Sequence, residues 1–101
     1  MNIEAVSQML INDGCHYDLA RIGFCQADVD IAVELAALGP TNADVQDENY
    51  LFENFPPYQK ADSLNTRRRW AIAQSAVLIA AKAKPEAVRL FGGEEFCILE
   101  Q

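Results

Sequence analysis

The sequence predicts a small all-α protein, a compact bundle of four to five helices around a long central helix. Three observations favour this fold class. Apolar residues recur at the spacing of an amphipathic helix in separate stretches of the chain. Capping residues and Gly or Pro stops bound these stretches. A chain of 101 residues, half of them apolar, can bury one core but not two, so we expect a single domain over residues 1–101.

The first predicted helix runs from a cap at Asn2 to about Asp13, and Gly14 provides a left-handed stop. The second begins near Asp28, whose carboxylate can accept hydrogen bonds from the first backbone amides, and runs to Leu38. Two adjacent apolar stripes leave this second helix only a narrow polar face. We therefore expect it to be largely buried.

The middle of the chain is predicted to be mainly non-helical. Residues 41–48 are polar, acidic and aperiodic, which indicates a surface loop with at most one helical turn near Gln46. Aromatic residues then crowd into residues 50–58, around Pro56 and Pro57. Two successive prolines disfavour a helix at that point and predict a stiff, extended connector.

A long helix over about residues 64–84, capped by Asp62 or Ser63, is predicted to be the central element. Alanines recur along it, so neighbouring helices can approach it closely. Pro85 ends this helix and begins a last short one. Residues 95–100 are a candidate for a short C-terminal strand.

The net charge of −7 limits the partners that the protein can have. It argues against nucleic acid and favours a protein with a basic surface. The charge is uneven, with −9 over residues 1–57 and +2 over residues 58–101. No apolar run is long enough to span a bilayer and no signal-like segment opens the chain, so we expect a cytoplasmic location away from membranes.

The chain shows no motif of a known catalytic class. Cys15 and His16 are the one thiol and imidazole pair close in sequence, but a cysteine nucleophile also needs an orienting third group. The spacing of Cys15, Cys25 and Cys97 matches neither a zinc site nor a disulfide framework. We therefore expect reduced structural thiols, no metal, no cofactor and no catalytic residues.

The run Arg67, Arg68, Arg69 and Trp70 has two interpretations. Three consecutive guanidinium groups fan around one helical turn and need acidic partners. In the first interpretation they pair with carboxylates of the acidic first half and hold the two halves together. In the second they form an anion-binding site for nucleic acid or a phosphate ligand, with Trp70 available for stacking.

The acidic and aromatic stretch before the two prolines is the candidate partner-binding surface. Aromatic side chains supply contact area at low entropic cost, and carboxylates around them can form a charged rim. The same aromatics could instead pack in the core or in an oligomer interface. The candidate residues are Asp44, Asp47, Glu48, Tyr50, Phe52 and Glu53.

One segment resembles part of a known family. It consists of Leu19-Ala20-Arg21-Ile22-Gly23-Phe24, followed by Asp28-Val29 and Ala32-Val33-Glu34-Leu35. This is similar to the first turn and second helix of a ubiquitin-associated domain, which has Met-Gly-Phe where this chain has Ile-Gly-Phe. The resemblance covers less than a quarter of the chain and implies an apolar docking patch at Ile22 to Phe24. The family's third helix would fall in the polar stretch after Gly39, so its function is not transferred.

These observations lead to a non-enzymatic protein-binding module that masks a basic site on a larger protein. An inhibitor, immunity protein or adaptor from a phage or another mobile element would fit this profile. The first alternative is a nucleic-acid or phosphate-ligand binder that uses Arg67–Trp70. A structural subunit of a homo-oligomer and an enzyme built on Cys15 and His16 are further alternatives.

Overall fold

The computed structural model describes residues 1–15 and 17–83, and all regular secondary structure in them is helical. The predicted all-α class is therefore confirmed. The seven helices of this part are α1 (Ile3–Asn12), α2 (Leu19–Ile22), α3 (Gln26–Ala36), α4 (Asn42–Val45), α5 (Glu48–Asn54), α6 (Pro56–Gln59) and α7 (Thr66–Lys82). None of them combines the length and the apolarity that crossing a bilayer requires. The predicted last helix and the strand over residues 95–100 lie outside the described residues.

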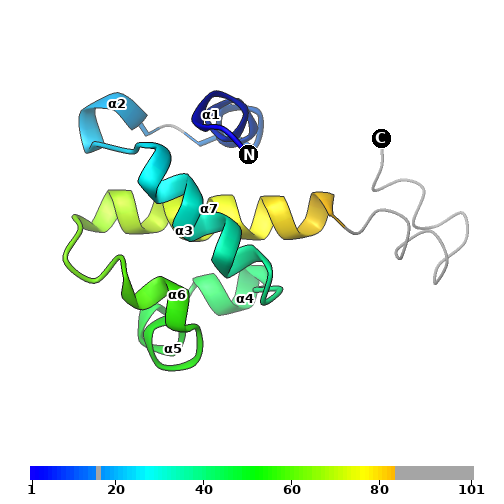
Figure 1. The fold of residues 1–101 in the computed structure, drawn as a ribbon, viewed down its shortest axis with the longest axis vertical. Coiled ribbons are helices and arrows are strands. Elements are labelled where there is room, and N and C mark those ends of the chain that lie inside the picture. The colour runs from blue at the N-terminus through cyan, green and yellow to red at the C-terminus, as the bar shows by residue number, and fades with distance from the viewer. Residues whose placement is uncertain (16, 84–101) are drawn as a thin grey trace, which may run out of the picture.

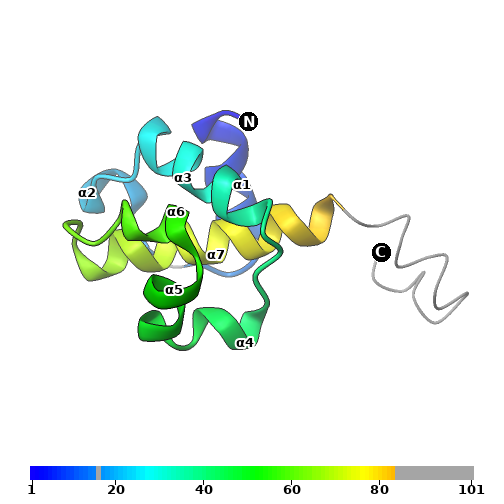
Figure 2. The same cartoon turned by 60° about the horizontal axis from the view of Figure 1, so that its bottom comes forward.

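The longest described helix, α7, runs through the middle of the fold (Figure 1). Figure 1 places α1 and α2 on one side of it and α4, α5 and α6 on the other, and Figure 2 again shows α4 and α5 on the side opposite α1. Helix α3 crosses α7 in the most extensive helix contact of the fold, and it also packs against α6 and α1. The first six helices thus surround α7.

The core draws one large side chain from each of five helices. These fully buried residues are Leu10 of α1, Leu35 of α3, Leu51 of α5, Tyr58 of α6 and Ile72 of α7. Helix α7 faces them largely with small residues, the buried Ala71, Ala73, Ala76 and Ala80. Small side chains let neighbouring helices approach α7 closely, as the alanine content predicts.

The first long helices differ from the prediction at their ends. Asn2 caps α1 as predicted, and its Oδ1 accepts a first-turn backbone N–H at 2.8 Å. Helix α3 begins earlier than predicted, because Cys25 is its N-cap and Asp28 is its third residue. It also ends earlier, at Ala36, and Leu38 is 52% exposed. The expectation that this helix is largely buried is wrong, since it packs against its neighbours along one side only.

Residues 41–54 are mostly helical. Helix α4 is the single turn expected near Gln46, which is its C-cap, whereas the seven-residue α5 was not predicted. Thr41 and Asp44 form a capping box, in which the Asp44 N–H donates to Thr41 Oγ1 at 3.2 Å and the Thr41 N–H donates to Asp44 Oδ2 at 2.8 Å. Asp47 caps α5 by accepting the backbone N–H of Tyr50. Helices this short show no apolar period, so their capping residues are the only local signal.

The two prolines begin a helix rather than exclude one. Phe55, the residue before them, is extended with φ −124° and ψ 90°, as the residue before a proline tends to be. Pro56 and Pro57 then occupy the first turn of α6, where a missing backbone N–H has no consequence. The predicted extended connector is therefore wrong.

Helix α7 is capped by Asn65 and not by Asp62 or Ser63. The Oδ1 of Asn65 accepts the backbone N–H of Arg68 at 2.9 Å, and its Nδ2 donates to the Ile22 carbonyl oxygen at 3.0 Å. The cap therefore also fixes the end of α2 against the start of α7.

Candidate functional site

Arg68 and Asp28 form a buried ion pair between α7 and α3. The Nε of Arg68 donates to Oδ2 of Asp28 at 2.6 Å, and its Nη2 donates to Oδ1 at 3.0 Å. Asp28 is only 1% exposed, so its carboxylate depends on this bidentate guanidinium and on the backbone N–H of Cys25. The hydrogen bonds to Asp28 raise the pKa of Arg68. The pair joins the second half of the chain to the first.

Arg69 forms a second internal pair, with Glu48 at the start of α5. Its Nε donates to Oε2 at 2.8 Å and its Nη2 to Oε1 at 3.3 Å, while Nη1 donates to the carbonyl oxygen of Leu64 at 2.6 Å. The hydroxyl of the buried Tyr58 donates to Oε2 of Glu48 at 2.9 Å. The hydrogen bonds from Arg69 lower the pKa of Glu48, and burial raises the pKa of Tyr58. This network anchors α5 and α6 to α7.

Two of the three guanidinium groups in the arginine run are thus used inside the molecule, as the first interpretation predicts. Arg67 is exposed and has no ion-pair partner in the described residues. Trp70 is half-buried. An anion-binding site built on this run would have Arg67 as its one unpaired guanidinium, unless an internal pair opened.

The six candidate partner-binding residues lie together on α4, α5 and the link between them, but two of them face inward. Glu48 is engaged with Arg69 and Tyr58. The ring of Phe52 packs on that of Tyr58, with 4.8 Å between the ring centroids. Glu48 and Phe52 therefore hold α5 in place, and little of their side-chain surface is available to a partner.

The other four candidates reach the surface. Asp44 and Asp47 accept backbone hydrogen bonds at the starts of α4 and α5; Asp47 is exposed and Asp44 is partly exposed. Tyr50 is 43% exposed, and Glu53 lies one turn further along α5, also exposed. The outer face of α5 therefore presents an aromatic ring next to carboxylates.

The surface of the described part is strongly acidic. Residues 1–83 contain eleven Asp and Glu and six Lys and Arg. Three of each form the ion pairs of Arg68, Arg69 and Lys60, the last with Glu34 at 2.6 Å. Eight carboxylates and three cations remain without an ion-pair partner in these residues. Ion pairing thus uses half of the cations, two of them inside the molecule and Lys60 on its surface, and it leaves a higher ratio of acid to base among the unpaired groups.

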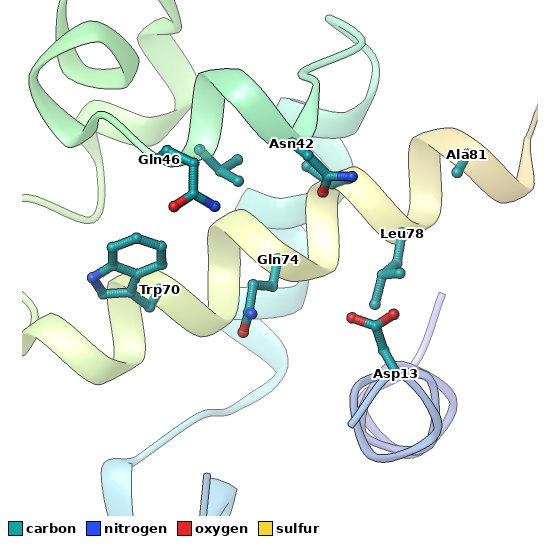
Figure 3. Close-up of a pocket in the computed structure, with 9 residues that line it drawn as sticks. Asp13, Asn42, Gln46, Trp70, Gln74, Leu78 and Ala81 are labelled. Carbon is teal, nitrogen blue, oxygen red and sulfur yellow. The ribbon is translucent and has the colours of Figure 1, made fainter. Parts of the chain in front are cut away.

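A groove of about 190 Å³ runs along α7, between α4 and the end of α1 (Figure 3). Its floor includes Trp70, Val77 and Leu78 of α7. Asn42 and Gln46 line it from α4, and Asp13 lines it from the end of α1. In Figure 3 the carboxylate of Asp13 points toward Leu78. The groove combines an apolar floor with amide and carboxylate edges.

Gln74 lies in this groove and has an unpaired amide oxygen. Its Oε1 is buried and has no hydrogen-bond donor in the described residues. The adjacent Ser75, the other polar residue in this apolar stretch, is satisfied because its Oγ donates to the Ala71 carbonyl oxygen at 2.6 Å. An unpaired buried carbonyl costs about 1–3 kcal/mol. No contact in the described part explains why Gln74 is polar.

The groove was not predicted from the sequence, although α7 carries a signal for it. Gln74 lies four residues after Trp70 and four before Leu78, so the three share one helix face. A polar side chain between two large apolar ones suggests a functional face. The α4 side of the groove was not predicted, because the single turn expected near Gln46 gave no indication that it packs against α7.

The thiols show no catalytic arrangement in the described residues. Cys15 and Cys25 are half-buried and unbonded to each other. The Sγ of Cys25 accepts a hydrogen bond from Nη2 of Arg68 at 3.5 Å. His16 and Cys97 lie outside the described residues. Within residues 1–15 and 17–83, no group of three or more His, Cys, Asp or Glu side chains could hold a metal ion.

The docking patch that the ubiquitin-associated resemblance implies is mostly inside the molecule. Phe24 is buried in the core and Ile22 is half-buried. Gly23 ends α2 in the left-handed region, with φ 85°. After Gly39 the chain forms the four-residue α4. The local turn is therefore similar to that family, but its exposed apolar patch would require Phe24 to leave the core.

No family model matches the chain, and comparisons with curated proteins and with solved structures give no match.

Proposed function

We propose that this protein is a non-enzymatic binding module that masks a basic site on a larger protein, as an inhibitor, immunity protein or adaptor does. The observation that carries the proposal is the excess of eight unpaired carboxylates over three unpaired cations in residues 1–83. Such an excess repels anionic ligands and steers the encounter with a basic surface.

The outer face of α5 is the proposed centre of contact. Tyr50 supplies the aromatic anchor, and Asp44, Asp47 and Glu53 form the acidic rim around it. The contacts of Glu48 hold this face rigid from beneath. A surface that is already ordered loses little conformational entropy when it binds.

The test is a pull-down from lysate of the source cell with the tagged full chain, with and without nuclease and at two salt concentrations. Three variants accompany the wild type: Tyr50→Ala, Glu53→Lys and the control Glu4→Lys. Glu4 is an exposed residue of α1, so the control makes the same charge change away from α5.

One stoichiometric protein should be captured, survive nuclease and weaken as salt rises. Tyr50→Ala should weaken its binding by roughly 2 kcal/mol, the loss typical of a central aromatic anchor. Glu53→Lys should weaken it and Glu4→Lys should not. Recovery of nucleic acid alone, or equal losses in both charge reversals, would contradict the proposal.

A further inference from the structure

The groove along α7 has the chemistry of a peptide-binding groove. Asn42 and Gln46 are exposed on its α4 edge, and Gln74 lies in it with an unpaired oxygen. Each amide side chain carries an acceptor and two donors, so it can pair with both the N–H and the C=O of a peptide bond. The two exposed amides on the α4 edge therefore match an extended backbone, and the buried oxygen of Gln74 becomes available to it when that side chain turns outward.

The dimensions of the groove agree with this occupant. Its volume of about 190 Å³ is smaller than the roughly 300–1,000 Å³ of small-molecule sites, so it suits one or two side chains rather than a cofactor. From Trp70 to Ala81 it follows eleven residues of α7, a length of about 17 Å at 1.5 Å per residue. An extended chain covers that distance with about five or six residues.

The charge at the groove indicates what the occupant carries. Among the described residues, Asp13 is the charged residue in the groove lining, and no Lys or Arg of residues 1–15 or 17–83 lines it. Helix α1 has no basic residue in its last turn, so nothing in that turn offsets this carboxylate. Its position at a helix C-terminus is unfavourable to α1 itself. A Lys or Arg side chain of a ligand, beside Leu78, would neutralise it.

We propose that this groove binds an extended segment of about five or six residues from the basic partner protein. The two exposed amides on the α4 edge pair with the backbone of the segment. An apolar side chain packs on Trp70 and Leu78, and a Lys or Arg meets Asp13. This inference rests on the proposed function and names the part of the partner that is recognised.

The test probes the full-length chain with an array of six-residue peptides and measures hits in solution by the fluorescence of Trp70, the one tryptophan in the sequence. Bound peptides should share an apolar residue near a Lys or Arg. Leu78→Glu and Gln46→Arg should each lower affinity at least about tenfold, because the first puts a charge on the apolar floor and the second repels a basic peptide. The control Ile11→Glu, at an exposed apolar residue of α1, should leave affinity within about twofold.

Asp13→Asn tests the charged contact separately. It should lower the affinity of Lys-containing peptides about fivefold and leave unchanged the same peptides with norleucine in place of Lys. The fold of this variant is not at risk, since it removes an unfavourable charge from the end of α1.

Absence of peptide binding, or equal binding by Leu78→Glu, Gln46→Arg and the wild type, would overturn the proposal. Shielding of Trp70 from acrylamide in the absence of peptide would also overturn it. Shielding that depends on protein concentration would mean that a second copy covers the groove. Shielding that is independent of concentration would mean that residues of the same chain cover it. In the pull-down, a partner retained by Leu78→Glu and lost by Glu53→Lys overturns the groove alone. A missing partner overturns the proposed function whatever the peptides show.

Discussion

Asp28 is the residue at which the fold depends most on one specific partner. A carboxylate with 1% exposure has lost its hydration and is stable as a charge only while Arg68 pairs with it. The two residues lie 40 positions apart in sequence, so the pair also fixes how α3 crosses α7. The guanidinium of Arg68 therefore both neutralises the buried carboxylate and fixes the orientation of α3 on α7.

Arg68→Ala should lower the free energy of unfolding by about 3–5 kcal/mol, because it leaves a buried carboxylate without a counterion. The neighbouring exposed Arg67→Ala is the matched control and should change it by no more than about 0.5 kcal/mol. Urea denaturation followed by circular dichroism measures both. Losses of equal size would mean that the Asp28 pair is not a principal contact.

Glu48 gives the fold an acid-sensitive contact. Hydrogen bonds from Arg69 lower its pKa below the ordinary 4.5. A carboxyl group whose pKa is lower in the folded state contributes stability that is complete above its unfolded pKa and is lost as the pH falls through the folded pKa.

Glu48→Gln should therefore be less stable than the wild type at neutral pH, and the gap should narrow as the pH falls from about 6 toward about 3. Urea midpoints of both proteins at a series of pH values measure this difference. The pH dependence that the other carboxylates cause is common to both proteins and largely cancels. A gap that stays constant with pH would mean that the charge of Glu48 does not matter.

At the scale of the helices, a side-chain cap lies at the start of most of them, whereas α6 begins at its two prolines. Asn65 replaces the two residues that the sequence suggested for α7, because only its side chain reaches both the Arg68 N–H and the Ile22 carbonyl. Any of several polar residues before a helix can cap it in principle. The choice among them depends on a contact with α2, which the local sequence does not contain.

Asn65→Ala should lower the free energy of unfolding by about 1–2 kcal/mol, the upper range for a lost N-cap, since the bond to α2 is lost as well. Ser63→Ala removes the polar group of a residue that does not cap α7 and should change it by less than about 0.5 kcal/mol. Chemical denaturation of the two variants side by side distinguishes them. A larger loss in Ser63→Ala would return the cap to the position that the sequence suggested.

Across the whole molecule, net repulsion among carboxylates opposes folding. The chain carries a net charge of −7. The attraction between Lys60 and Glu34 offsets little of the resulting repulsion, because their side chains are 57% and 51% accessible. The less exposed Arg68 and Arg69 pairs are screened less by salt than surface charges are.

Raising NaCl to about 0.5 M should therefore increase the thermal midpoint of the full chain while weakening its binding to a basic partner. Differential scanning calorimetry gives the first quantity and the pull-down at two salt concentrations gives the second. A midpoint that falls with salt would show that favourable surface pairs outweigh the repulsion.

The candidate site was only partly predictable. Tyr50 and Glu53 are exposed as a binding surface requires. Glu48 and Phe52 are likewise an acidic and an aromatic residue, but they face inward. Composition cannot distinguish the exposed pair from the inward pair, because in a seven-residue helix residues only a few positions apart lie on opposite faces. The groove of Gln74 needed α4, whose four residues carry no periodic signal.

The sequence by itself determined the all-α class, the first helix and its cap at Asn2, the alanine-rich helix and the acidic charge, because these follow from local periodicity, capping and composition. Only the tertiary structure decided that Pro56 begins a helix, that Arg68 and Arg69 are internal, and that a groove opens along α7. The arginine pairs and the groove depend on groups far apart in sequence that meet only when the helices pack. The helix at Pro56 is held in place by the bond from the Tyr58 hydroxyl to Glu48 of α5.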